Sequence, residues 1–189
     1  MRIGKVLSSV IAVLLVSKLL EAACSNGDCK NNSLPFNKYA FLTTHNSFAI
    51  DDGKLRLTFT NQEDTISQQL NNGVRGLMLD VYDYKGDIWL CHSLKGKCHD
   101  TTKFEPAIET FREIEAFLSQ NPYEIVTLIL EDYVETPNGL TNVFNESGIM
   151  KYWFPLSSMP KGGQDWPLAI YNICLKVSLL LSAFKDFDN

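Results

Sequence analysis

The sequence lacks a cluster of basic residues. Its 189 residues include 17 Lys and Arg against 22 Asp and Glu, which gives a formal net charge of -5, and the basic residues do not gather in a block. A nucleic-acid-binding protein needs a patch of positive charge to neutralise phosphates. Nucleic acid is therefore not an expected partner.

The sequence also lacks an apolar run long enough to cross a bilayer comfortably. The run over 6–20, near the N-terminus, is shorter than a membrane span, follows Arg2 and Lys5, and is succeeded by the small residues Ala22 and Ala23. This arrangement is typical of a secretory signal peptide. We predict a signal peptide over residues 1–23 and a secreted or cell-surface protein.

No internal repeat or low-complexity tract occurs in the chain. Without the signal peptide, roughly 165 residues remain, which is enough for a single domain with a hydrophobic core. The next residues, 24–34, form a short cysteine-containing segment ahead of that domain.

The cysteines are interpreted as disulfides, because a secreted chain passes through an oxidising compartment. We expect Cys24 to pair with Cys29 and Cys91 with Cys98, although four cysteines allow three connectivities. Cys174 is left over. Asn31 and Asn145 begin N-glycosylation sequons, which are expected in surface loops.

The hydrophobic pattern alternates between strands and helices. It predicts strands over 38–44, 74–84, 87–93 and 124–133, and helices over 61–73 and 105–122, the second with Pro106 at its first position. Residues 136–166 are rich in loop signals, and the aromatic residues at 152–154 are expected to pack a short helix against the body. The alternation favours an α/β fold with a mostly parallel sheet, open or closed into a barrel.

Potential reactive side chains fall at the carboxyl ends of the predicted strands, where the loops of such folds build the functional site. These are His45, Asp80, His92 and Glu131. A lone histidine near a strand end is more often a structural residue than a catalytic one. Asp132 and Tyr133 either support Glu131 or are solvated, and His99 is expected on the surface.

Four motifs resemble, in order and spacing, those of the secreted plant relatives of the phosphatidylinositol-specific phospholipase C X domain. They are THNS at 44–47, GVRGLMLD at 73–80, WLCHS at 89–93 and NPYEIVTLILED at 121–132. The resemblance covers 35–167 and implies a TIM-barrel-like phosphodiesterase fold, of which this chain supplies the first half, as a truncated product would. The hydrophobic tail over 168–189 does not resemble the family's continuation.

The resemblance implies hydrolysis of a phosphodiester by two histidines. When an internal hydroxyl attacks phosphorus, one group must take its proton and another must protonate the leaving alcohol, and both tasks suit histidine. His45 matches the first histidine of the family, as base or phosphate ligand, and His92 the second, as acid.

The resemblance also implies a cation that neutralises charge on the phosphoryl oxygens. Asn46, Asp80 and Glu131 match three oxygen ligands of the calcium-dependent members. The fourth ligand, a glutamate in that family, is Met78 here, so calcium is expected to be weakly held, completed by water, or absent. Arg75, on the opposite strand face from Asp80, is predicted to form a structural ion pair.

The predicted function is therefore hydrolysis of a phospholipid or a related phosphodiester by a phospholipase C-like mechanism. The expected partners are that substrate and a membrane surface. Met78 and the missing second half favour an alternative, in which the chain is a non-catalytic phosphate- or headgroup-binding protein or an inactive truncated isoform. A glycerophosphodiester phosphodiesterase-like enzyme is a further alternative, since that barrel also uses two histidines.

Overall fold

The computed structural model describes residues 35–122 and 124–154. Several predictions concern residues outside these ranges: the signal peptide over 1–23, the Cys24–Cys29 pair, the sequon at Asn31, Cys174 and the tail over 168–189.

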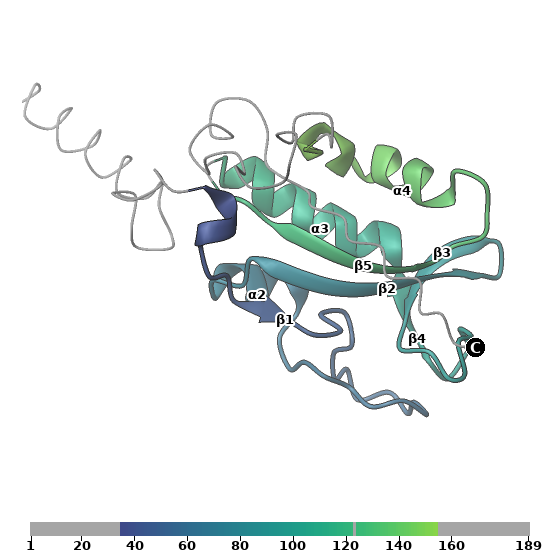
Figure 1. Cartoon of the computed structure of the whole chain (residues 1–189). Coiled ribbons are helices and arrows are strands. Elements are labelled where there is room, and N and C mark those ends of the chain that lie inside the picture. Colours follow the sequence, from purple (N-terminus) through teal and green to yellow (C-terminus); the bar gives the residue numbers. More distant parts are fainter. Residues whose placement is uncertain (1–34, 123, 155–189) are drawn as a thin grey trace, which may run out of the picture.

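The centre of the molecule is a five-stranded sheet (Figure 1). Strand β2 (Gly76–Tyr84) pairs in parallel with β5 (Thr127–Tyr133), and its first residues also pair in parallel with the short β1 (Thr43–Thr44). Its second half forms an antiparallel hairpin with β3 (Asp87–Cys91), which in turn pairs with β4 (Lys103–Pro106). The sheet is therefore mixed rather than mostly parallel, because the chain doubles back after Tyr84.

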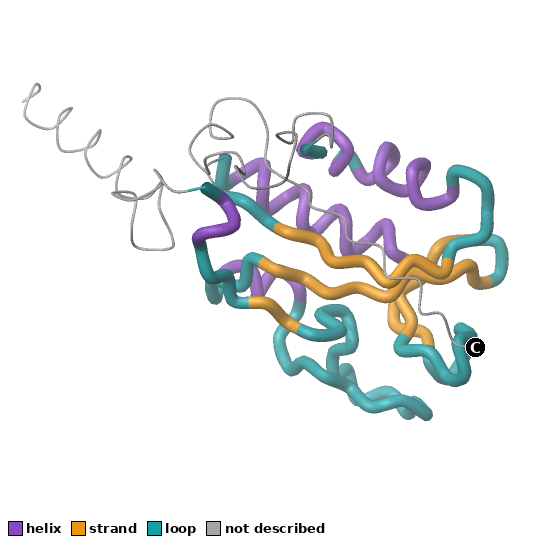
Figure 2. Tube along the Cα trace, viewed as in Figure 1, coloured by secondary structure: helices purple, strands orange, loops and turns teal. Residues whose placement is uncertain are grey.

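Three α-helices accompany the sheet in the described ranges. They are α2 (Ile66–Asn71), α3 (Ala107–Gln120) and α4 (Gly139–Ser147), and two 3-10 turns, η1 (Phe36–Lys38) and η2 (Ile149–Tyr152), flank the domain. Helices α3 and α4 run next to each other along the same side of the sheet (Figure 2). Among these residues, none of the helices is long and apolar enough to cross a membrane.

Strand alternation divides β2 and β5 into two faces. Leu77 and Leu79 of β2 pair in register with Leu128 and Leu130 of β5, and all four are fully buried in the core, which also contains Phe111, Ile114 and Leu118 of α3. The opposite face presents Met78, Asp80 and Tyr82 of β2 with Ile129, Glu131 and Tyr133 of β5. Apolar burial thus fixes the strand register and orients the polar residues away from the helices.

Close contact between β1 and β2 requires a glycine at position 76. A Cβ atom added to Gly76 would lie 2.2 Å from Oγ1 of Thr43, which is far inside van der Waals contact. The glycine therefore lets the end of β1, and the motif after it, lie directly against β2.

Helix α2 begins at Ile66, later than expected. The Thr65 hydroxyl accepts a hydrogen bond from the Gln68 backbone N–H, and the Gln68 side chain accepts one from the Thr65 N–H, which forms a capping box. The acidic residues Glu63 and Asp64 precede the helix instead of starting it. The local capping geometry decided this boundary.

The structure corrects the predicted strand over 38–44. Only Thr43 and Thr44 pair as strand residues, while Phe36 and Phe41 stack on each other with ring centroids 5.0 Å apart and Leu42 remains 61% exposed. The apolar run before the THNS motif is therefore mostly a local aromatic cluster rather than a buried strand.

Strand β4 was missed by the sequence patterns. It is short and ends in Pro106, which is the N-cap residue of α3 instead of part of its first turn. Helix α4 lies inside the segment rich in loop signals, and its length was not predicted, because its small and polar residues surround the buried Val143 and Phe144. The expected packing of a short helix by the aromatic residues at 152–154 is present, since Trp153 lies 6.1 Å from Phe144 between ring centroids. Asn145 is exposed near the end of α4, so its sequon lies in a helix and not in a loop.

Candidate functional site

The THNS motif forms a tight turn that is fixed against the centre of β2. The Ser47 N–H donates to the Met78 carbonyl oxygen at 2.9 Å, and the Met78 N–H donates to the Ser47 hydroxyl at 3.0 Å. Asn46, the residue between His45 and Ser47, has a positive φ of 44°, a conformation that asparagine tolerates better than most residues. The turn therefore has one defined position at the sheet.

Gln69 of α2 stabilises this turn through side-chain hydrogen bonds. It is 2% exposed, its Nε2 donates to the carbonyl oxygens of Ser47 and Asp64 at 2.8 Å each, and its Oε1 accepts from the Thr44 hydroxyl at 2.7 Å. Our sequence analysis missed this residue. A signal existed, because a polar side chain one position before Leu70 and three after Ile66 lies on the buried face of the helix.

After the THNS turn the chain returns at residues 59–62 and contacts His45 and Asn46. The His45 side chain is exposed, and its carbonyl oxygen accepts from Gln62 Nε2 at 2.7 Å. Asn46 is buried, and its Nδ2 donates to Asn61 Oδ1 at 3.3 Å. The Asn46 amide oxygen is thereby left as the acceptor that a cation or a substrate hydroxyl could use.

His92 follows β3, and its ring is held by the same returning segment. Its Nδ1 lies 2.8 Å from the carbonyl oxygen of Phe59, while its backbone N–H donates to the Thr102 carbonyl at 3.1 Å. A carbonyl oxygen only accepts hydrogen bonds, so Nδ1 carries a hydrogen and Nε2 is the nitrogen free to gain or lose a proton. Residues 59–62 therefore contact both histidines.

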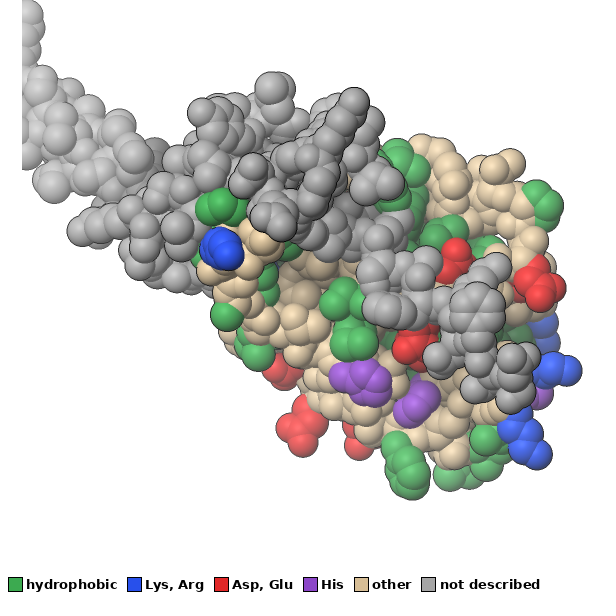
Figure 3. Space-filling view, in the orientation of Figure 1, with side chains coloured by type: hydrophobic (Ala, Val, Ile, Leu, Met, Phe, Trp, Pro, Cys, Tyr) green, Lys and Arg blue, Asp and Glu red, His purple; other side chains and the backbone are tan. Residues whose placement is uncertain are grey.

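Histidine side chains lie next to acidic side chains near the centre of the face that Figure 3 shows. Segments remote in sequence form this face, since Phe59 contacts a ring 33 positions away at His92. The fold thus brings both motif histidines into contact with the same loop. The motifs suggested that the two histidines belong to one site but did not show this contact.

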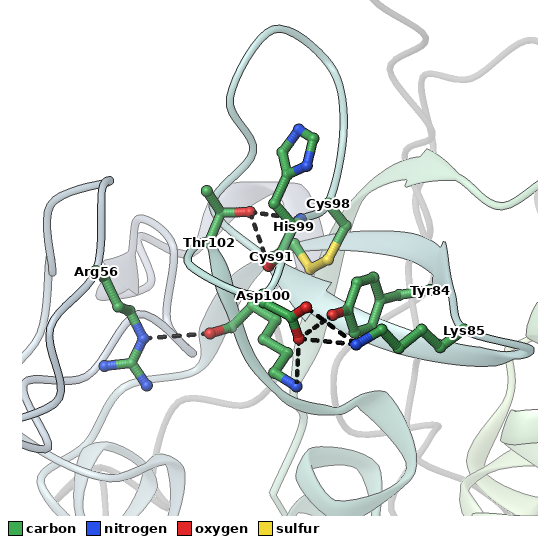
Figure 4. Close-up of polar contacts among 9 residues, drawn as sticks. Arg56, Tyr84, Lys85, Cys91, Cys98, His99, Asp100 and Thr102 are labelled. Atoms are coloured by element: carbon green, nitrogen blue, oxygen red, sulfur yellow. Dashed lines mark hydrogen bonds and ion pairs between the residues drawn. A yellow bond between two sulfur atoms is a disulfide. The ribbon is translucent and has the colours of Figure 1, made fainter.

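A disulfide closes the loop that contains His92. Cys91 and Cys98 are bonded, with their Cα atoms 5.7 Å apart, and this pairing is the one expected from the sequence (Figure 4). His99, next to Cys98, is exposed, and its backbone N–H donates to the Thr102 hydroxyl at 2.9 Å. The disulfide therefore joins the two ends of this loop, and one of the two cysteines, Cys91, directly precedes His92.

Asp80 and Glu131 are neighbours in register across the β2 and β5 pair. Both residues were expected at the carboxyl ends of their strands. In the structure they lie inside the strands instead, because β2 continues into the hairpin and β5 extends to Tyr133. Burial, and next the charge of Glu131, raise the pKa of Asp80 from 3.8 to about 7. No described group donates a hydrogen bond to the Asp80 carboxyl.

Two tyrosines complete this face of the sheet. The Tyr133 hydroxyl donates to Glu131 Oε2 at 3.0 Å, and its ring stacks on Tyr82 with centroids 4.5 Å apart and an interplanar angle of 11°. Burial raises the pKa of both phenols, so they remain protonated donors at neutral pH. The hydrogen bond confirms one of the two alternatives expected for Tyr133, namely that it supports Glu131, whereas Tyr82 was not identified from the motifs.

The donor set fits a hard cation such as calcium. Asp80 and Glu131 supply adjacent carboxylates that repel each other, and Asn46 supplies an amide oxygen on the neighbouring turn. Met78 faces the same side as Asp80 but offers only a thioether, and the described residues contain no group of three or more His, Cys, Asp or Glu suited to a metal. Water would have to complete the coordination.

Arg75 lies on the other side of the sheet, at the amino-terminal end of β2. It is 2% exposed, its Nε donates to Glu124 Oε2 at 2.8 Å, and its guanidinium lies 4.9 Å from the Phe117 ring centroid. Its NH1 donates to the carbonyls of Leu70 and Val74. These contacts join β2 to α2 and α3 and do not involve the site face.

Comparison with solved structures identifies the fold. The chain matches the phosphatidylinositol-specific phospholipase C of Listeria monocytogenes with a TM-score of 0.56 and 16% sequence identity, over 85% of this chain and 56% of that one. The protein therefore has the α/β fold of the phospholipase C-type phosphodiesterase barrels, in the form of a partial barrel.

Sequence comparison identifies the family. The family model described as PI-PLC X 1 matches residues 32–178, and a PI-PLC X domain-containing protein of Arabidopsis thaliana is 61% identical over 141 residues. This chain belongs to the PI-PLC X domain family. An uncharacterized secreted protein of Arthroderma benhamiae is 28% identical over 129 residues, or 67% of this chain and 27% of that protein.

This chain spans about a third of the length of the curated relatives that it matches. The Arabidopsis match covers 72% of this chain and 33% of the relative. The activity and partners of the whole relatives are therefore not transferred to it directly.

Proposed function

We propose that this chain is a phosphoric diester hydrolase of the phospholipase C-like type, which acts on a phospholipid or a related phosphodiester with His45 and His92 as its acid-base pair. The main support is the position of both histidines at segment 59–62, where the Phe59 carbonyl meets the His92 ring and Gln62 meets the His45 backbone. Family membership supports the substrate class.

The two histidines would divide the proton transfers. An internal hydroxyl of the substrate attacks phosphorus and gives its proton to His45, while His45 or Asn46 also contacts the phosphate. The bond from phosphorus to the leaving alcohol breaks, and His92 donates a proton from Nε2 to that alcohol. The product is a cyclic phosphodiester. Hydrolysis would be completed by a water molecule that attacks phosphorus and gives a proton to His92, while His45 returns its proton to the internal hydroxyl as the ring opens. The Phe59 carbonyl holds the His92 Nδ1–H, which orients the ring so that only Nε2 exchanges protons.

Asp80, Glu131 and Asn46 are the residues that would hold a calcium ion. The ion would supply positive charge to the phosphoryl oxygens. Because Asp80 is protonated up to about pH 7 and Met78 provides no oxygen, we propose that calcium binds weakly and more strongly at alkaline pH.

The decisive experiment measures release of phosphorylated headgroup from phosphatidylinositol by the purified secreted chain, with calcium and with a chelator. We expect His45→Ala and His92→Ala each to reduce the rate by at least about a hundredfold. His99→Ala is the matched control, since that imidazole is exposed and lies outside the pair. Absence of release by the folded parent chain, or full activity in either variant, would contradict the proposal.

A second candidate function is non-catalytic binding of a phosphate or lipid headgroup. Met78 favours it, because a thioether stands on the site face where the family's calcium-dependent members have a carboxylate. In that case the parent chain binds inositol phosphate in calorimetry, His92→Ala weakens this binding, and no headgroup is released.

We also propose that the protein is secreted. Support comes from the N-terminal sequence, the disulfide at Cys91 and Cys98, and the relative described as a secreted protein.

A further inference from the structure

Two adjacent carboxyl groups on the site face of the sheet have no positive side chain as a partner. Asp80 of β2 and Glu131 of β5 are paired in register, and Asp80 is only 7% exposed. None of the ion pairs among the described residues includes either carboxylate. Because like charges at neighbouring positions repel each other, a cation bound by both carboxylates would relieve the repulsion.

Tyr133 engages one of the two oxygens of the Glu131 carboxylate. Its hydroxyl donates to Glu131 Oε2 at 3.0 Å, and its ring is held by stacking on Tyr82, which is itself 4% exposed. The Tyr82 hydroxyl in turn interacts with those of Ser93 and Tyr133. The tyrosine pair therefore holds Glu131 in one orientation and leaves Oε1 as the oxygen free of this hydrogen bond.

Few other protein oxygens are available near this carboxylate pair. Asn46 is 3% exposed and donates through Nδ2 to Asn61, while its amide oxygen accepts no hydrogen bond from a described residue. Met78 lies on the same strand face as Asp80 and offers only sulfur. The described residues thus supply one buried amide oxygen and two carboxylates, one of which is already hydrogen-bonded at Oε2.

This set of oxygens suits magnesium better than calcium. Calcium takes six to eight oxygen ligands in a flexible geometry and often binds a carboxylate through both of its oxygens. Magnesium is smaller, takes six ligands, keeps several of its waters and typically binds a protein through one or two carboxylates. A hydrogen bond at Glu131 Oε2 opposes binding through both oxygens, whereas binding through Oε1 alone is compatible with it.

We propose that this site selects magnesium over calcium, and that Tyr133 determines the selectivity because its hydroxyl opposes binding of a cation through both oxygens of Glu131. Without that hydroxyl, Glu131 offers its second oxygen and calcium gains a ligand. The inference rests on the proposed function for the role of the site, and it names the divalent cation that would balance the charge of the phosphoryl oxygens.

The test titrates the isotope-labelled secreted chain with magnesium chloride and, separately, with calcium chloride, and follows the backbone amide signals by NMR. No substrate is present, and the pH is kept above the pKa of Asp80, which is about 7, so that both carboxylates are charged. We expect the signals of Asn46, Asp80 and Glu131 to shift and to saturate at a lower concentration of magnesium than of calcium.

Tyr133→Phe removes the hydroxyl and keeps the ring that stacks on Tyr82. We expect the ratio of calcium affinity to magnesium affinity to rise about tenfold, as changes in residues that hydrogen-bond to metal ligands commonly produce. A merely structural role of Tyr133 would change both affinities by the same factor and leave the ratio unchanged. Tyr84→Phe is the matched control, since it removes a phenol hydroxyl that donates to Asp100 instead, and its ratio should equal that of the parent.

Three results would overturn the inference: tighter binding of calcium than of magnesium by the folded parent, no binding of either cation, or an unchanged ratio in Tyr133→Phe. Cation binding is measured without turnover, so these results are separate from those that test the proposed function. If headgroup release is absent but the parent prefers magnesium and Tyr133→Phe shifts the ratio, the catalytic proposal fails and the cation selectivity stands. If release persists in a chelator and neither cation binds, the selectivity fails and the catalytic proposal stands.

Discussion

The Asp80 carboxyl lies buried in β2 and faces Glu131 of β5. Burial and the neighbouring charge raise its pKa from 3.8 to about 7. Since the folded-state pKa lies above the unfolded value, the folded protein holds this proton more tightly. The resulting stability is present below about pH 4 and is lost as the pH rises toward 7.

Asp80→Asn should remove that loss, because the amide does not titrate. We expect the free energy of unfolding of the parent to fall between pH 5 and pH 8 by about 1 to 3 kcal/mol more than that of the variant. Urea titrations at the two pH values measure this difference. Asp132→Asn, the adjacent acid on β5, is the control, and an unchanged pH dependence in Asp80→Asn would refute the interpretation.

At the scale of the element, α2 supports both the core and the site. Ile66 and Leu70 are fully buried in the core, and Gln69 forms hydrogen bonds to the turn that carries His45 and Asn46. A helix this short is not stable by itself, so the capping box at Thr65 and these tertiary contacts maintain it. The geometry of the turn therefore depends on a side chain 25 positions away from Thr44.

Gln69→Leu should destabilise the protein by about 2 to 4 kcal/mol, since it leaves the Ser47 and Asp64 carbonyls without their Gln69 donor and leaves the Thr44 hydroxyl with Ser47 as its remaining side-chain partner. Chemical denaturation measures this loss, and Asn71→Ala, on an exposed position of the same helix, should cost far less. Because the turn holds His45, Gln69→Leu should also shift the His45 ring signals in NMR spectra of the folded chain. Unchanged stability and unchanged signals would show that the network is unimportant.

At the scale of the whole molecule, the two faces of the sheet have different roles: one packs against helices in the core, and the other carries the candidate site. Helices α3 and α4 cover one side, and the loop over residues 51–60 projects from the molecule away from them (Figure 1). Asn145 is exposed on α4, so a glycan there would lie on the helix-covered side. The candidate site would remain accessible.

Asn145→Gln is therefore expected to remove one glycan from the secreted protein without lowering the release of phosphorylated headgroup. Mass spectrometry of the product from a eukaryotic host, before and after glycosidase treatment, measures the first effect. The headgroup-release assay measures the second. A loss of release in this variant, with the fold intact, would show that the helix-covered side contributes to the site.

The sequence by itself determined the features that depend on neighbouring residues. Short apolar runs predicted the strands around Leu77 and Leu128, a helical spacing of apolar residues predicted α3, and the ordered motifs identified the family and the histidines. Local patterns were insufficient at β4 and α4, because a four-residue strand and a helix of small and polar residues form only when the rest of the sheet and α3 bury them.

Only the tertiary structure decided how the site is assembled. The raised pKa of Asp80 requires Glu131 on another strand, and the single exchangeable nitrogen of His92 requires the Phe59 carbonyl from a remote loop. These properties arise from contacts between distant segments, whereas propensity and periodicity act over a few residues, so the motifs specify the reactive groups and the fold sets their chemistry.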